Sequence, residues 1–172
     1  MSDPGTIRAG RPADAPAYAA ILNAWIDATP WMPRLHTPQD VMAWHRDTVF
    51  PRARVLVAER GGPCGFLVLE APRADGAAPF VTGFYVAQAV RGLGVGRALL
   101  RAAKRAAPEG LRLWTFAANA AARRFYAREG FAEVGGSSGE NEEGLPDILC
   151  TWPGSLVPAS PPPSAAEEEH RV

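Results

Sequence analysis

The chain has 172 residues, 47% hydrophobic and 21% charged, a balance that favours one globular domain with a sizeable core. Its 18 basic and 18 acidic residues cancel, which argues against the broad basic surface of a nucleic-acid or anionic-membrane binder. The sequence shows neither a membrane-length apolar run nor a signal segment, and two distant cysteines, Cys64 and Cys150, indicate buried or idle thiols in a cytoplasmic protein. Three scattered histidines predict no metal site.

The first third of the chain predicts one strand and two helices. The expected elements are a strand at 5–10, a helix at 14–28, a proline-broken loop at 29–35 and a helix at 37–49. Asp14 is a suitable N-cap for the first helix, and Thr37 followed by Pro38 is a typical start for the second.

The remainder alternates strands with two further helices. Strands are expected at 54–59, 65–70, 80–86, 111–116, 131–134 and 145–152, helices at 97–107 and 120–129, and a polar loop at 135–144. The segment 60–63 predicts a hairpin turn, Asn119 a helix cap, and Gly130 a left-handed helix end. Residues 153–172 are rich in Pro, Ser, Ala and Glu and are expected to form a disordered tail outside a domain at 1–152.

The chain is organised around a strand, a glycine-spaced turn and a helix at 80–107. The first N–H groups of a helix lack internal partners and carry the positive end of its dipole, so they attract anions. Glycines at 92, 94 and 96 remove the Cβ atoms that would keep a phosphate away. This stretch therefore predicts a site for phosphate or pyrophosphate, although glycines that merely turn the chain are an alternative.

Two familiar phosphate motifs do not fit this loop. A P-loop requires Lys-Ser/Thr after its last glycine, and the dinucleotide fingerprint requires a sixth-position glycine where Arg97 stands. The pattern that fits is Arg/Gln-x-x-Gly-x-Gly/Ala, met by Arg91, Gly94 and Gly96. In this the loop resembles that of the GCN5-related N-acetyltransferases (GNAT family), which hold the pyrophosphate of acetyl-CoA there.

A second block strengthens the resemblance. GNAT proteins commonly continue with a strand and then Asn-x-x-Ala-x-x-Phe-Tyr-x-x-x-Gly-Phe, which here is Asn119, Ala122, Phe125, Tyr126, Gly130 and Phe131. The similarity covers roughly residues 5–152. It implies an α/β (α+β) GNAT fold, with a mixed, mostly antiparallel central sheet flanked by helices. It also implies an acetyl-CoA-dependent N-acetyltransferase that transfers the acetyl group to a primary amine of a small molecule or peptide by direct attack on the thioester.

The resemblance assigns roles residue by residue. The CoA pyrophosphate would lie on the loop made of Arg91, Gly92, Leu93, Gly94, Val95, Gly96 and Arg97. The backbone of Phe84, Tyr85 and Val86 would pair with the pantetheine amides and polarise the thioester carbonyl. Asn119 would contact the CoA arm, and Tyr126 would contact the cofactor and act as general acid. Core packing for Tyr126 and capping alone for Asn119 are the structural alternatives.

The general base is not assigned, because the strand at 80–86 carries no acid. Glu70, Glu142, Glu143 and Asp147 remain candidates, and a water-mediated base or none is equally acceptable.

By resemblance, the acceptor pocket lies between the N-terminal helices and the late loops. There Trp31, Met32, Glu142 and Glu143 are expected to contact substrate, while helix-face core packing is the favoured interpretation of Trp25 and Trp44. Aromatic groups beside carboxylates suit a small cationic amine.

Two other functions remain open. A non-catalytic acyl-CoA-binding regulatory module would keep the phosphate loop without the acceptor chemistry. A protein N-terminal or lysine acetyltransferase would use the same cofactor site, whereas the balanced charge argues against a nucleic-acid-associated target. Many GNAT domains dimerise, but no stretch of this sequence requires a homodimer.

Overall fold

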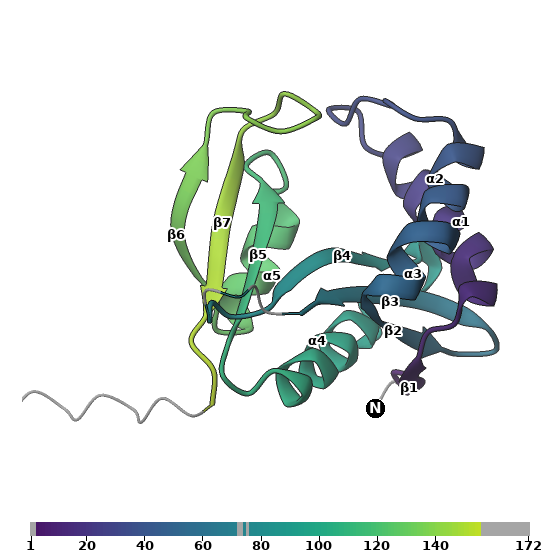
Figure 1. Cartoon of the computed structure of the whole chain (residues 1–172), viewed down its shortest axis with the longest axis horizontal. Helices are drawn as coiled ribbons and strands as arrows, with labels where there is room; N and C mark the ends of the chain where they lie inside the picture. Colours follow the sequence, from purple (N-terminus) through teal and green to yellow (C-terminus); the bar gives the residue numbers. More distant parts are fainter. Residues whose placement is uncertain (1–2, 72–73, 75, 156–172) are drawn as a thin grey trace, which may run out of the picture.

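The computed structural model describes residues 3–71, 74 and 76–155 (Figure 1). Its strands are β1 Thr6–Ala9, β2 Arg54–Glu59, β3 Pro63–Glu70, β4 Phe80–Val86, β5 Leu111–Phe116, β6 Ala132–Ser137 and β7 Asp147–Trp152. Its helices are α1 Ala15–Asp27, α2 Pro38–Trp44, α3 Phe50–Arg52, α4 Val95–Ala106 and α5 Ala120–Arg128, with short turns η1 Pro12–Asp14, η2 His45–Val49 and η3 Gln88–Val90. Most of the predicted tail, 156–172, lies outside the described residues. No helix of the described part is long and apolar enough to cross a membrane.

The described strands form one seven-stranded sheet in the order β1-β2-β3-β4-β5-β7-β6. Neighbours are antiparallel except β4 and β5, which are parallel. The predicted mixed, mostly antiparallel sheet flanked by helices is therefore confirmed.

The two halves of the sheet separate between β4 and β5. These strands pair only at Phe80 with Arg112 and at Val81 with Leu113, after which they diverge (Figure 1). On its other side, β4 keeps its pairing with β3 but shifts register so that Thr82 is an extra residue. Such a bulge bends a strand and leaves the extra residue unpaired. Beyond Val81, β4 therefore has an edge that β5 does not occupy.

Each face of the sheet has its own core. On one face, the buried Leu99, Leu100 and Ala103 of α4 pack with the apolar face of α5 against the sheet. Their spacing on an amphipathic helix directs one stripe inward. On the opposite face, Tyr18 of α1 and Phe50 of α3 pack on β2 and β3.

Three details of the expected elements were wrong. Asp14 stands before α1, but its side chain makes no cap bond to that helix and instead accepts hydrogen bonds from Arg8 and from the Arg11 amide at the start of η1. The helix expected to end at Val49 changes to a π-helical turn at η2 and continues to Arg52. Strand β6 extends to Ser137, into the predicted polar loop, because it pairs with β7 there.

Candidate active site

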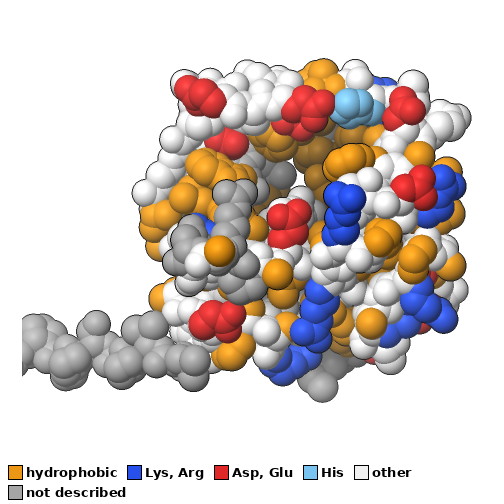
Figure 2. Space-filling view, in the orientation of Figure 1, with side chains coloured by type: hydrophobic (Ala, Val, Ile, Leu, Met, Phe, Trp, Pro, Cys, Tyr) orange, Lys and Arg blue, Asp and Glu red, His pale blue; other side chains and the backbone are white. Residues whose placement is uncertain are grey.

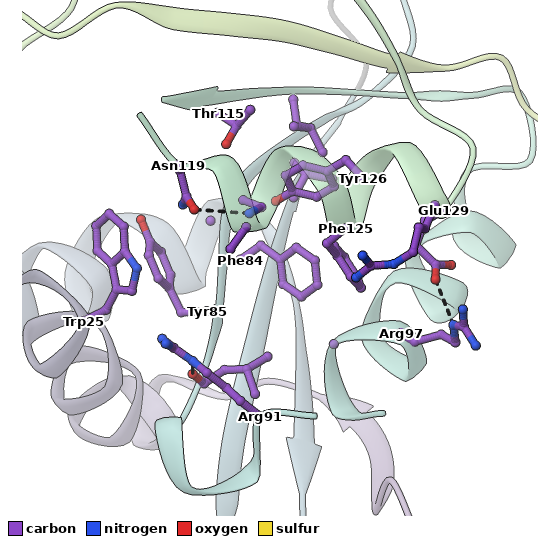
Figure 3. A pocket seen from close by; sticks show the side chains of 18 of the residues that line it. Trp25, Phe84, Tyr85, Arg91, Arg97, Thr115, Asn119, Phe125, Tyr126 and Glu129 are labelled. Carbon is purple, nitrogen blue, oxygen red and sulfur yellow. Dashed lines mark hydrogen bonds and ion pairs between the residues drawn. The ribbon is translucent and has the colours of Figure 1, made fainter. Parts of the chain in front are cut away.

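The first cavity, of about 670 Å³, lies at the separation of β4 and β5, with the glycine loop and α5 on its sides. Figure 3 shows Phe84 and Tyr85 on one side, Tyr126 and Asn119 on another, and Arg91 and Arg97 at the loop. Five of the seven loop residues assigned from the sequence line it, together with Phe84, Tyr85, Val86, Asn119 and Tyr126. Leu93 and Val95 do not: Val95 is 1% exposed and packs in the core, so only its backbone can face a ligand.

The glycine loop adopts a conformation that glycine favours. Gly92 and Gly94 have φ of 78° and 86°, and Gly94 immediately precedes α4. The first helical bond reaches from the amide of Ala98 to the carbonyl of Gly94, which leaves the three preceding amides without partners inside the helix. A Cβ at Gly92 would meet nothing within 4 Å. The loop therefore offers free amides and open space, which fit a pyrophosphate.

The charges of this cavity also suit phosphates. Arg91, Arg97 and Arg128 line it, against one carboxylate, Glu129. Nε of Arg97 lies 2.8 Å from Oε1 of Glu129, whose side chain is 10% exposed, and this ion pair joins the start of α4 to the end of α5. Guanidinium groups bind phosphate oxygens through paired hydrogen bonds. The residues present therefore fit the pyrophosphate-containing cofactor expected from the sequence.

Tyr126 and Asn119 come to this cavity from α5. Tyr126 is 8% exposed, and its hydroxyl has no hydrogen-bond partner among the described residues. Burial raises the pKa of Tyr126 well above its ordinary value, so the hydroxyl keeps its proton at neutral pH. Asn119 does cap α5, since its Oδ1 accepts from the amide of Ala122 at 3.1 Å. Its side-chain NH₂ is left available to a ligand.

A second cavity, of about 870 Å³, lies between the α1–α2 region and the β6–β7 loop. Figure 2 shows a hollow on this side of the molecule, with hydrophobic side chains in its depth and acidic and histidine side chains at its rim. Four carboxylates line it, from Asp40, Asp47, Glu142 and Glu143, and no Lys or Arg of the described residues does. The lining of the second cavity is therefore negatively charged, whereas that of the first is positively charged.

Three of the four predicted acceptor residues line this cavity. Met32, Glu142 and Glu143 line it, whereas Trp31 does not. The ring of Trp31 instead packs between Trp25, at 5.9 Å, and Phe116, at 5.7 Å. Trp44, for which core packing was favoured, is 59% exposed and lines the cavity.

The two cavities meet at a shared wall. Trp25, Thr82, Tyr85 and Phe116 line both. The rings of Trp25 and Tyr85 lie 5.5 Å apart, and burial, with the nearby Glu143, raises the pKa of Tyr85 to about 12. A group held in one cavity can therefore reach a group held in the other at this wall.

Of the base candidates, only the loop glutamates Glu142 and Glu143 line a cavity. Glu70 is exposed at the end of β3, and Asp147 is bonded to Ser137 and Asn141. His45, to which the sequence assigns no role, also lines the second cavity. No motif marks it, because a distant loop completes its surroundings.

Comparisons with known proteins also find acetyltransferases. A family model described as "Acetyltransferase (GNAT) domain" matches residues 51–133. The chain is 28% identical to the ribosomal-protein-alanine N-acetyltransferase from Brucella melitensis, with 85% of this chain and 98% of that chain covered and a TM-score of 0.65. It is 25% identical to yncA from Salmonella typhimurium, whose structure contains its cofactor acetyl-CoA, with 92% and 98% covered and a TM-score of 0.66. It is 29% identical to a nourseothricin acetyltransferase, with 60% and 66% covered and a TM-score of 0.53. No curated protein matches.

Proposed function

Because the chain is a GNAT-family acetyltransferase with acetyl-CoA as its donor, we propose that it acetylates a primary amine of a small molecule or peptide bound in the second cavity. The observation that carries this proposal is the meeting of a cavity lined by arginines and a cavity lined by carboxylates at Tyr85. Acyl transfer needs the acetyl group and the amine to meet at one point, and a shared wall provides it.

The chain supplies the remaining parts of the reaction from named groups. Acetyl-CoA brings a thioester, whose carbon is open to attack by a neutral amine. Backbone groups on the free edge of β4 beyond Val81 can polarise its carbonyl. The protonated hydroxyl of Tyr126 can give its proton to the departing thiolate. The attack is direct, because Cys64 and Cys150 are buried and line neither cavity.

The lining of the second cavity supports a cationic acceptor. An alkylamine has a pKa of about 10 and arrives as an ammonium ion. Glu142 and Glu143 can attract it, while the rings of Trp44 and Phe116 can contact its alkyl part or its charge. Burial raises the pKa of both cysteine thiols, so both stay protonated and weakly nucleophilic at neutral pH.

The printed names of the neighbours include both kinds of acceptor. One is a ribosomal-protein-alanine N-acetyltransferase, and another acetylates nourseothricin by its name. A protein N-terminus therefore stays as the alternative to a small amine. The test is release of free thiol from acetyl-CoA with a panel of probes: propylamine, 1,5-diaminopentane, 2-phenylethylamine and a short peptide with a free N-terminus. Turnover with at least one probe supports the proposal, and turnover with none contradicts it.

A further inference from the structure

His45 occupies an unusual place in the helical region above the sheet. It is the first residue of η2, where the amide of Phe50 bonds to the carbonyl of His45 rather than to that of Arg46. The next residue, Pro51, has no N–H to continue the ladder. A π-helical turn adds a residue to the turn and re-aims side chains, and such turns are frequent at functional sites. His45 itself still has regular helical geometry at the end of α2, and it lines the second cavity where this turn begins.

The hydrogen bonding of His45 fixes its tautomer. Its Nδ1 lies 2.6 Å from the carbonyl oxygen of Val41, and a carbonyl can only accept, so Nδ1 carries the proton. The Nε2 atom therefore has a free lone pair and no partner among the described residues. Every side-chain nitrogen or oxygen that is completely sealed from solvent among the described residues has a partner, so the unpartnered Nε2, like the hydroxyl of Tyr126, is at least partly accessible. Tyr18 packs on the ring at 4.3 Å between centroids and holds its orientation.

The other titratable groups near His45 are less suited to take a proton from an amine. Burial raises the pKa values of Tyr18 and Tyr85, which stay protonated. The remaining acids and the second histidine of the cavity are Asp40, Asp47, Glu142, Glu143 and His36. Asp47 is paired with Arg46, which lowers its pKa, and Glu142 is paired with His36. A carboxylate with a pKa near 4 is also a weaker base than imidazole near 6.5.

We propose that Nε2 of His45 accepts the proton of the acceptor ammonium, directly or through one water, an inference that rests on the proposed function. The lone pair of Nε2 takes one proton, which leaves a neutral amine and an imidazolium. The amine nitrogen then forms a bond to the acetyl carbon as the carbon–sulfur bond breaks. The sulfur keeps that electron pair and takes the proton of Tyr126, which regains one from the nitrogen. The imidazolium loses its proton to solvent, so an ammonium and a thioester give an amide, a thiol and one proton.

The burial of His45 lowers its pKa, so it is neutral and able to accept a proton at pH 7. As the pH falls through this lowered pKa, Nε2 becomes protonated and the rate must fall. We expect kcat/KM of the wild type to show an acid limb of unit slope with its inflection below pH about 6.5. The same inflection must appear in the NMR titration of the His45 ring. This comparison needs no variant.

The matched variants are His45→Asn and His36→Asn. An asparagine at 45 places an N–H near the former Nδ1, where it can still donate to Val41, but it has no basic nitrogen. We expect His45→Asn to lose about 10²- to 10⁴-fold in kcat/KM, and its acid limb, at an unchanged acetyl-CoA-dependent rise in Tm. His36→Asn releases Glu142 at the mouth of the same cavity and can change KM for the amine, but it should keep the acid limb.

A wild-type rate and pH profile in His45→Asn would overturn the role of His45 and leave the proposed function standing. So would a wild-type kinetic inflection that does not coincide with the NMR titration of His45, and this result stands even if the variant fails to fold. Absence of thiol release from the wild-type protein with every amine probe would instead overturn the proposed function.

Discussion

Nε2 of His36 and Oε1 of Glu142 lie 2.6 Å apart, although 106 residues separate them in the chain. The contact joins the loop between α1 and α2 to the loop between β6 and β7, at the rim of the second cavity. Both side chains are more than half exposed, so the pair adds little to stability. The contact holds the carboxylate of Glu142 at the rim, where an ammonium ion would enter the cavity.

The entrance carboxylates should therefore affect acceptor binding. We expect Glu142→Gln and Glu143→Gln each to raise KM for the amine about two- to fivefold, the value of an exposed charge pair, with kcat little changed. Steady-state kinetics at saturating acetyl-CoA measures this. Glu109→Gln, an exposed site that lines neither cavity, is the control. Equal KM values in all three variants would remove these carboxylates from the acceptor site.

Gly94 should be required for cofactor binding. Valine at this left-handed position would both strain the backbone and place a branched side chain at the phosphate loop, so Gly94→Val is expected to lose the Tm rise caused by acetyl-CoA. Gly61→Val imposes the same kind of strain at a left-handed turn that lines neither cavity. It should lose about 1–2 kcal/mol of stability and keep the Tm rise. Retention of the rise in Gly94→Val would exclude the loop as the phosphate site.

Tyr126 should be needed for turnover and not for binding. We expect Tyr126→Phe to lower kcat about 10²- to 10⁴-fold with an unchanged acetyl-CoA-dependent Tm rise, since only a proton donor is removed. Its own Tm should change little, because the hydroxyl has no partner among the described residues. Tyr85→Phe, which removes the hydroxyl at the shared wall, is the comparison. A loss confined to Tyr85→Phe would move the general acid to Tyr85.

The Arg8–Asp14 ion pair should make stability depend on pH. Asp14 accepts two hydrogen bonds from Arg8, both of 2.8 Å, and these bonds are the main cause of its lowered pKa. A carboxyl with a lowered folded-state pKa stabilises the protein above its unfolded pKa of about 3.9, and this stabilisation is lost as pH falls through the folded value. Asp14→Asn should therefore cost about 1–3 kcal/mol at pH 7. Denaturant unfolding should show the difference shrinking below pH about 4; a constant difference would contradict the assignment.

Local signals in the sequence were sufficient for most of the fold. The β-branched and aromatic run of β4 gave its bounds correctly, at Phe80–Val86, because such residues fit a buried strand. Thr37 caps α2 and Gly130 ends the α5 segment with φ of 87°, as their side-chain and backbone preferences predict. The cofactor side of the site follows from these local patterns.

The acceptor side depends on contacts between distant segments and could not be derived in the same way. Asp14 was predicted to cap α1, but β1 places Arg8 beside it and its carboxylate forms an ion pair there instead. Trp31 was predicted to contact the acceptor, but its ring packs between those of Trp25 and Phe116. His45 lines the second cavity together with Glu142 and Glu143 of a distant loop, and no local pattern in the sequence distinguishes it from the other residues of its helix.

The most direct test of the account follows thermal unfolding with acetyl-CoA together with amine-dependent release of thiol. Acetyl-CoA at about 100 times its Kd should add about 2.7 kcal/mol of stability, a Tm rise of about 5–10 °C. Thiol release should then depend on an added primary amine and fall as that amine is diluted. A Tm rise without thiol release on any amine would indicate a CoA-binding module, and no rise at millimolar acetyl-CoA would contradict the cofactor site itself.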